Sequence, residues 1–234
     1  MAYSEEEILQ ICRRLEKIYT PAVSDSLDEM GYRSGVMKAD LSPIIPGRAV
    51  AGPAFTIEES EADPSMPQKL ADMDPAFVTS ILEAVFENMP RGSMMVITTN
   101  GYDGSGAFGE LMGTTALYYC GSVGAVVDGP IRDIPRLLEI NFPVWARGSI
   151  PTDSVGRAQL NGVGQIINCG GIEISPRDIV FADQDGVVVI PVNNIDASKV
   201  LKLAEERAHD ERRSRQEIRE GRSLKEVYQK YGRL

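Results

Sequence analysis

Histidine is nearly absent from this sequence, because His209 is the single histidine among 234 residues. A metal centre built from several histidines is therefore excluded, and a Ser-His-Asp triad is disfavoured. Any metal would have to be a hard cation held by carboxylates. The three cysteines, Cys12, Cys120 and Cys169, lie far apart and form no C-x-x-C pair. This spacing predicts reduced, structural thiols in a cytoplasmic protein.

Long apolar runs and an excess of basic charge are also missing. No apolar stretch reaches the roughly 18 residues of a membrane-spanning helix, so we expect no membrane partner. The acidic start of the chain has no apolar segment of a secretory leader. The formal net charge of −10 argues against a nucleic-acid partner, since non-specific binding to a polyanion requires a basic surface. Hydrophobic residues at 43% and charged residues at 25% indicate an ordinary globular protein.

Apolar periodicity and breaking residues predict the secondary structure. The first helix is marked by Ser4 and Glu7, which have the spacing of a capping box. Helices are expected over residues 4–19, 23–30, 77–88, 110–120, 133–140, 193–219 and 224–231. Buried strands are expected at 93–99, 123–127 and 143–147, a strand, turn and strand at 44–57, and a surface loop at 58–75. Four short runs after residue 165 have the turn residues of antiparallel hairpins.

The order of these elements predicts an α/β fold. Strand and helix alternate over residues 93–147, which implies a β-α-β-α-β unit with a parallel sheet. The chain has no internal repeat and no linker, so one domain over 1–234 is the simplest division. We expect its core at about 20–192 and a C-terminal helical extension at 193–234.

The segment V-G-A-V-V-D-G-P-I-R-D at 123–133 is the strongest motif. A buried strand is followed by Gly-Pro, so that Arg132 and Asp133 come just beyond its C-terminal end, where open α/β sheets bind ligands. A salt-bridged surface pair is the simpler alternative. Glu110 follows the preceding strand, and loops after adjacent parallel strands share one crevice. Two carboxylates and one arginine there could hold Mg²⁺ together with an anionic oxo-acid.

A literal G-x-G-x-x-G stands at 104–109, before a predicted helix. It could be a dinucleotide-binding fingerprint, which would make the protein an oxidoreductase. However, its first glycine comes five residues after Thr99, whereas the fingerprint requires the turn directly after the strand. The segment could instead be a flexible loop, or its backbone amides could form a cradle for a carboxylate or phosphate.

The motif V-V-D-G-P-I-R-D, preceded by G-E-L, resembles the metal-dependent 4-hydroxy-4-methyl-2-oxoglutarate aldolase family. That family shares its fold with the regulators of ribonuclease E activity, and many members carry the misnomer demethylmenaquinone methyltransferase. The resemblance runs from about Thr20 to Tyr228 and includes V-S-D-S-L-D-E-M-G, P-G-R-A-V-A-G-P-A-F-T, F-P-V-W-A-R-G and P-R-D-I-V-F-A-D-Q-D-G-V-V-V-I-P. It implies a swivelling β/β/α-type single domain with a central mixed sheet and a long C-terminal helix. It also implies a homotrimer or hexamer.

The resemblance assigns roles to residues of the motif. Arg132 would contact the 2-oxo oxygen of a pyruvate-like substrate and stabilise the enolate, and Asp133 would be the protein ligand of Mg²⁺ or Mn²⁺. Glu110 would transfer a proton through water. The substrate carboxylate would be bound by backbone amides of the loop, namely those of Gly109, Glu110, Leu111 and Met112. A glutamate of a neighbouring subunit's C-terminal helix would approach the site, with Glu211 as the first candidate and Glu206 as the second.

Two departures affect the assignment of Glu110. Glutamate stands where aspartate is common in the family, and 21 residues separate Glu110 from Arg132, one more than in the family pattern. The position of Arg132 and Asp133 is more secure, because their motif is contiguous.

The expected activity is that of a divalent-metal-dependent class II aldolase and decarboxylase acting on small pyruvate-containing oxo-acids. Retro-aldol cleavage of 4-hydroxy-4-methyl-2-oxoglutarate and decarboxylation of oxaloacetate share a pyruvate enolate, so one site could serve both. A lysine Schiff base is disfavoured, since no lysine lies between Lys69 and Lys199. The alternative is a non-catalytic, ribonuclease-binding regulator of the same fold.

Overall fold

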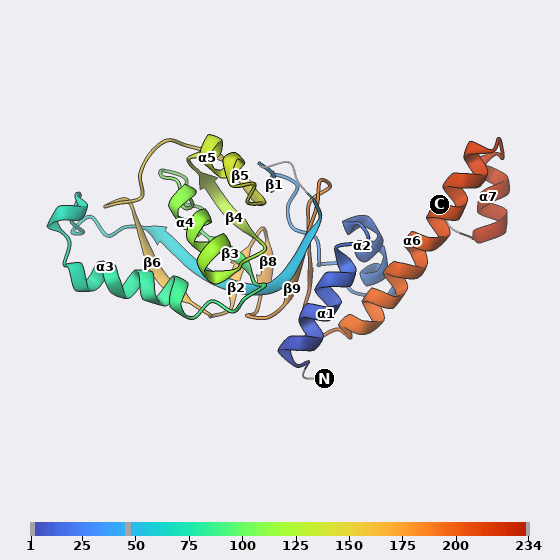
Figure 1. Ribbon diagram of the computed structural model, residues 1–234, viewed down its shortest axis with the longest axis horizontal. Coiled ribbons are helices and arrows are strands. Elements are labelled where there is room, and N and C mark those ends of the chain that lie inside the picture. Colours follow the sequence, from blue (N-terminus) through green and yellow to red (C-terminus); the bar gives the residue numbers. More distant parts are fainter. Residues whose placement is uncertain (1–2, 45–47, 233–234) are drawn as a thin grey trace.

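A mixed sheet forms the centre of the computed structural model, which describes residues 3–44 and 48–232 (Figure 1). Its strand order is β1-β5-β4-β3-β2-β9-β10, and β6 pairs with β2. The strands are β1 (Ser42–Pro43), β2 (Val50–Glu61), β3 (Met94–Thr98), β4 (Gly124–Ile131), β5 (Val144–Ser149), β6 (Ala158–Val163), β9 (Ile179–Ala182) and β10 (Val187–Ile190). A separate hairpin consists of β7 (Ile167–Cys169) and β8 (Ile172–Ile174). The predicted mixed-sheet α/β fold is confirmed.

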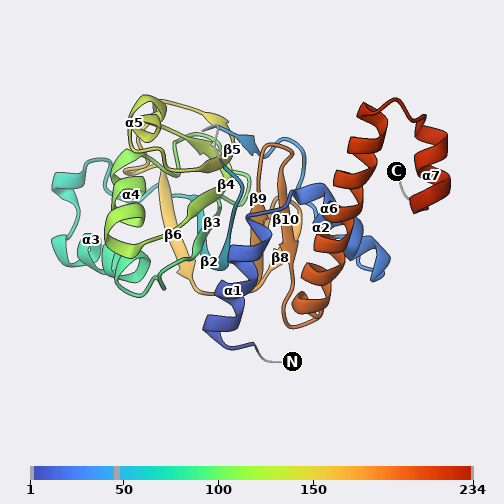
Figure 2. The ribbon, with the colours of Figure 1, turned by 45° about the vertical axis from the view of Figure 1, so that its right-hand side comes forward.

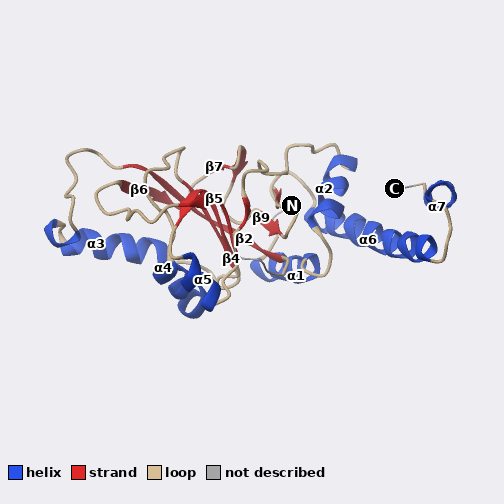
Figure 3. Cartoon of the chain, turned by 90° about the horizontal axis from the view of Figure 1, so that it is seen from above, coloured by secondary structure: helices blue, strands red, loops and turns tan. Residues whose placement is uncertain are grey.

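Two groups of helices flank the sheet (Figure 2). They are α1 (Glu5–Leu15), α2 (Thr20–Glu29), α3 (Pro75–Leu82), α4 (Glu110–Thr114), α5 (Ile134–Glu139), α6 (Ala197–Arg219) and α7 (Leu224–Tyr231). A short turn, η1 (Leu70–Asp72), precedes α3, and π-helical turns extend α3 and α4 as η2 (Glu83–Glu87) and η3 (Thr115–Cys120). Seen from above, α3, α4 and α5 lie along one face of the sheet (Figure 3). In the described part of the chain, no helix combines the length and apolar character needed to cross a membrane.

The predicted parallel unit is confirmed. Strands β2, β3, β4 and β5 are parallel neighbours, and Glu58, Thr98 and Asp128 stand at the same level of the sheet. Because parallel strands have their C-terminal ends at one edge, the loops after β3 and β4 meet there. The predicted capping box of α1 is present, and the hairpins β7-β8 and β9-β10 are antiparallel.

The predicted strand, turn and strand at 44–57 is wrong where it places a break at Gly52-Pro53; residues 45–47 lie outside the described part. Strand β2 is continuous through both residues, but it changes partner there. Val50–Pro53 pair with β9, and Ala54–Glu58 pair with β3. Pro53 is tolerated at this change of partner, where a missing N–H is least disruptive. Gly52 is required, because a Cβ would lie 2.5 Å from the carbonyl oxygen of Gly92.

Several other boundaries differ from the prediction. Strand β4 runs to Ile131, through the Gly129-Pro130 at which it was expected to end, because it pairs with β5 again after a register shift. Strand β2 runs on to Glu61, into the predicted loop at 58–75, because β6 pairs with it there. Strand β6 was not predicted, since its burial is only partial and its sequence lacks a clear apolar alternation. Thr20-Pro21 opens α2 rather than only ending α1, in agreement with the preference for proline in the first helical turn.

Three apolar clusters hold the elements together. One lies between the parallel strands and the helices α4 and α5, and includes Phe108, Ile131 and Leu137. The second packs α1, α2 and α6 on β9 and β10. The third is closed by the β7-β8 hairpin and contains the buried Trp145. The first cluster fixes the height of α4 and α5 above the sheet edge, and therefore positions the loops that carry the motif residues.

Candidate functional site

Arg132 and Asp133 lie directly after β4, in the turn that enters α5. Asp133 has a left-handed backbone with φ of 60°, an uncommon conformation for a residue other than glycine and one that is frequent at functional sites. Its carboxylate points back to the start of α4, where Oδ2 accepts a hydrogen bond from the amide of Glu110 at 3.2 Å. The loops after β3 and β4 are thus joined, as the topology predicts.

Arg132 is held by two carboxylates. Its Nη1 lies 3.0 Å from Oδ1 of Asp153, and its Nε lies 3.6 Å from Oδ2 of Asp133. The arginine side chain is 34% exposed, so solvent and ligands still reach it. The sequence allows two interpretations of the segment 153–157 after the next strand, a plain loop or a part of the pocket wall, and assigns no specific role to Asp153. The structure identifies it as the residue that orients the Arg132 guanidinium.

The glycine-rich segment packs against the motif strand. The amide of Ala107 donates to the carbonyl oxygen of Pro130 at 2.9 Å, and the amide of Arg132 donates to that of Phe108 at 2.8 Å. A Cβ at Gly109 would lie 2.7 Å from Oδ2 of Asp133, so only glycine permits this approach. These contacts explain why glycine stands at position 109 without invoking a bound dinucleotide. They disfavour both the dinucleotide-binding and the flexible-loop interpretations of the segment.

Glu110 stands in the first turn of α4, beside the pocket that contains Arg132. Its Oε1 accepts a hydrogen bond from the Thr114 hydroxyl at 2.5 Å, and its carboxylate also helps to raise the pKa of Arg136 on α5, where Glu139 is the main cause. Gly109, Leu111 and Met112 line the pocket, whereas the Glu110 side chain does not. Of the predicted substrate-binding amides, that of Glu110 is engaged by Asp133.

A pocket of about 310 Å³ opens at Arg132 and Asp133 and extends beneath α3. Its walls come from β2, η1, α3, η2, the start of α4 and β6. Most of the lining side chains are apolar, and they include Met73, Phe77, Ile81, Phe86, Met112 and Leu160. Arg132 and Asp133 therefore line a largely apolar pocket.

Glu59 is a site residue that the sequence analysis missed. It lies on β2, opposite Leu160 of β6, and lines the same pocket as Arg132. Its Oε2 is inaccessible to solvent and has no hydrogen-bond partner among the described residues. Burial among apolar side chains raises the pKa of Glu59 from 4.5 to about 7. Its position two residues after the buried Ile57 is the signal that could have identified it.

Asp128 and Arg147 form an ion pair away from this pocket. Oδ2 of Asp128 also accepts a hydrogen bond from the amide of Gly170 at 2.7 Å, which ties β4 to the β7-β8 hairpin. Asp128 therefore has a structural role, and Asp133 is the carboxylate of the motif that lines the pocket.

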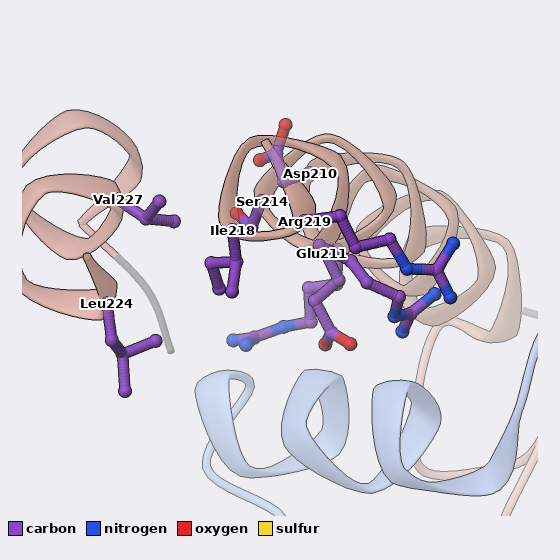
Figure 4. Close-up of a pocket in the computed structure, with 9 residues that line it drawn as sticks. Asp210, Glu211, Ser214, Ile218, Arg219, Leu224 and Val227 are labelled. Atoms are coloured by element: carbon purple, nitrogen blue, oxygen red, sulfur yellow. The ribbon is translucent and has the colours of Figure 1, made fainter. Parts of the chain in front are cut away.

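Glu206 and Glu211 lie on α6, at the other end of the molecule from α4 and α5 (Figure 1). Oε2 of Glu211 accepts a hydrogen bond from the Tyr19 hydroxyl, and Oε1 of Glu206 lies 4.0 Å from Nζ of Lys202. Figure 4 shows Glu211 in a groove with Ile218 on the same helix and Leu224 on α7. One chain does not bring these glutamates to Arg132, so their approach from a neighbouring subunit stays a prediction.

A hard divalent cation fits the groups at Asp133. No cluster of three or more potential metal-ligating side chains occurs among residues 3–44 and 48–232, so a fully protein-enclosed metal site is not formed there. Mg²⁺ typically takes only one or two carboxylates and completes its shell with water and substrate oxygens. The Asp133 carboxylate, with 43% of its side chain exposed beside the arginine, suits that pattern.

Comparisons with known proteins agree with this fold. A family model described as RraA-like, Aldolase/RraA, matches residues 20–189. A protein of Halalkalibacterium halodurans, provisionally named 4-hydroxy-4-methyl-2-oxoglutarate aldolase, is 32% identical over 85% of this chain and 84% of its own length.

Solved structures show the same architecture. An uncharacterized protein from Pseudomonas syringae pv. tomato superposes with a TM-score of 0.76 and 27% identity, over 93% of this chain and 96% of its own. Streptomyces coelicolor RraAS2, described as an unusual member of the RNase ES inhibitor RraA protein family, has a TM-score of 0.73 and 27% identity, over 88% of this chain and 96% of its own.

Proposed function

We propose that this chain, which belongs to the RraA-like family described as Aldolase/RraA, is a divalent-metal-dependent lyase that cleaves pyruvate-containing oxo-acids. The observation that carries the proposal is the pair Arg132–Asp133, which lines one pocket just beyond β4. The relative named provisionally as an aldolase supports the reaction class. Retro-aldol cleavage of 4-hydroxy-2-oxo acids and decarboxylation of oxaloacetate are the reactions to test.

Arg132 stabilises the charge that develops during cleavage. Electrons of the breaking C–C bond move onto the 2-oxo oxygen of the pyruvyl half, and the guanidinium lies where it can donate hydrogen bonds to that oxygen. Asp153 holds the guanidinium in place before the reaction, so little reorganisation is needed. Loss of one such preorganised donor typically lowers the rate by about 10²–10³-fold.

The cation would be held by Asp133. When bound, Mg²⁺ or Mn²⁺ would supply positive charge beside the substrate carboxylate and 2-oxo oxygen. Asp133 is kept in orientation by its left-handed backbone and by the amide of Glu110. The free amides of Leu111 and Met112, at the first turn of α4, are the groups that would bind the substrate carboxylate.

In retro-aldol cleavage Glu110 would take the proton of the 4-hydroxyl as the C–C bond breaks and would return it to the pyruvate enolate, which gives pyruvate. Its carboxylate lies beside the pocket rather than in its lining, so the transfer would pass through one water molecule. Glu206 and Glu211 would complete the site only from another copy, which makes a homotrimer or hexamer part of the proposal.

The variant pair Asp133→Ala and Arg132→Ala tests the site. With oxaloacetate and 4-hydroxy-4-methyl-2-oxoglutarate as substrates, we expect Asp133→Ala to abolish metal-dependent pyruvate release. We expect Arg132→Ala to lower kcat/KM by about 10²–10³-fold. Arg13→Ala is the control, since Arg13 is exposed on α1 and pairs with Glu6, and neither residue lines the pocket. Full activity of both site variants would contradict the proposal.

A ribonuclease-binding regulator is the second candidate. The similarity to RraAS2, which belongs to an RNase ES inhibitor family, favours it. Regulators of this fold tend to lack the acidic residue after the glycine, which Glu110 supplies here. Inhibition of a ribonuclease by the purified chain, together with no pyruvate release from any oxo-acid, would favour the regulator over the lyase.

A further inference from the structure

We infer that the pocket selects oxo-acids whose half distal to the pyruvyl group is uncharged and mainly apolar, with a hydrogen-bond donor that reaches Glu59. This inference rests on the proposed function and names the substrate class for the same site. It departs from the dicarboxylate 4-hydroxy-4-methyl-2-oxoglutarate, which carries a second carboxylate in its distal half.

The walls of the pocket support an apolar ligand. From Arg132 the pocket runs beneath α3 and η2, where Phe77, Ile81 and Phe86 face it, and it is closed on the sheet side by Leu160 of β6. Burial of apolar surface contributes about 25 cal/mol per Å², so an alkyl or aryl group would gain affinity here and a carboxylate would lose its hydration.

The charges of the pocket oppose a second carboxylate. Arg132 is the only cationic side chain among the described residues that line the pocket, and it already pairs with Asp153 and Asp133. In the proposed reaction Arg132 also donates hydrogen bonds to the 2-oxo oxygen. The remaining charged group is acidic, because Glu59 lies in the same chamber. A distal carboxylate would meet no free cation and would be repelled whenever Glu59 is ionised.

Glu59 is placed to recognise a donor group of the substrate. It follows Glu58, which pairs with Thr98 at the C-terminal end of β3, so Glu59 stands at the same sheet edge as the motif residues. Its Oε2 is buried and without a partner among the described residues. A buried acceptor without a partner costs about 1–3 kcal/mol, which a hydroxyl of the ligand would recover. The 4-hydroxyl of a 4-hydroxy-2-oxo acid is such a donor.

Two substrates distinguish the possibilities in a coupled assay of pyruvate release. One is 4-hydroxy-2-oxo-4-phenylbutanoate, with an uncharged aryl group, and the other is 4-hydroxy-4-methyl-2-oxoglutarate. We expect kcat/KM to be at least tenfold higher for the aryl compound. Glu59→Gln should raise kcat/KM for the dicarboxylate about tenfold at pH 8. Glu61→Gln is the control, because Glu61 is an exposed acid on the same strand.

A higher kcat/KM for the dicarboxylate, with pyruvate released, would overturn this inference and leave the proposed function intact. Pyruvate from neither compound, with oxaloacetate still decarboxylated, would overturn this inference alone. No pyruvate from oxaloacetate either would overturn the proposed function as well. If Glu59→Gln and Glu61→Gln changed kcat/KM for the dicarboxylate equally, Glu59 would have no specific part in substrate selection.

The variant Phe77→Asp provides an independent measurement, since Phe77 lines the pocket and is 44% exposed. It should lower kcat/KM for the aryl compound selectively. If Phe77→Asp dissociated the oligomer and left the ratio of kcat/KM for the two substrates unchanged, this wall of the pocket would instead be a contact with a second copy of the chain.

Discussion

Replacing Glu59 by glutamine should change the pH dependence of folding stability. Glu59 is a partly buried residue whose Oε2 is shielded from solvent, and this burial of its carboxyl group raises its pKa from 4.5 to about 7. Between these two pH values the unfolded chain has released the proton, whereas the folded chain still holds it. Stability contributed by the neutral carboxyl is therefore present below pH 4.5 and is lost as the pH rises through about 7.

The size of this effect follows from the difference in pKa. Each unit of pKa difference corresponds to about 1.36 kcal/mol. The change from 4.5 to about 7 thus amounts to an upper limit on the order of 3 kcal/mol when Glu59 is fully ionised. Glutamine has the shape of the neutral acid and no titration, so Glu59→Gln should match the native chain at pH 5 and exceed it at pH 8.

Thermal unfolding at the two pH values measures this difference. In a chain of this size 1 kcal/mol shifts Tm by about 2–4 °C, so we expect Glu59→Gln to melt up to roughly 6–12 °C above the native chain at pH 8. At pH 5 the two should differ little. Glu61→Gln should have no such pH-dependent effect. An equal difference in Tm at both pH values would refute the buried, neutral state of Glu59.

Two further predictions concern the orientation of the motif pair. Gly109→Ala places a methyl group within 2.7 Å of Oδ2 of Asp133, so it should raise the Mg²⁺ concentration needed for half-maximal pyruvate release by more than tenfold. Gly162→Ala on β6 is the control, because the three atoms nearest to its added Cβ belong to the exposed side chain of Gln165. An equal effect of Gly162→Ala would contradict the contact argument. Asp153→Asn weakens the 3.0 Å ion pair with Arg132 and should lower kcat about tenfold. Tm should change little, since the pair is partly exposed. An unchanged kcat would show that Arg132 needs no orienting partner.

The parallel half of the fold could be predicted because its signals are local. The run Ala125–Val127 is apolar, and after Asp128 the strand no longer pairs with β3 and only continues against β5 with a shifted register. The edge at which Arg132 emerges therefore follows from sequence order alone. The course of β2 through Gly52-Pro53 could not be predicted in this way. Its cause is a change of strand partner, which depends on residues far away in the chain.

The site was predictable where its residues are contiguous and less so where they are not. Arg132 and Asp133 form one motif, and the glycine of the preceding loop lies against them. Glu59 and Asp153 come from other strands and loops, and their roles depend on burial and on one distance. For Glu110 the predicted position in the first helical turn is confirmed, but the direction of the side chain was not predictable. Its carboxylate accepts a hydrogen bond from Thr114.

The central claim is metal-dependent pyruvate release at Arg132–Asp133. The most direct measurement is a lactate-dehydrogenase-coupled assay of the purified chain over a panel of 4-hydroxy-2-oxo acids and oxaloacetate, after treatment with EDTA and after addition of Mg²⁺ or Mn²⁺. We predict that chelation abolishes pyruvate release from at least one compound and that the added cation restores it. Full activity in EDTA would contradict the metal dependence, and no pyruvate from any compound in the presence of either cation would contradict the assignment as a lyase.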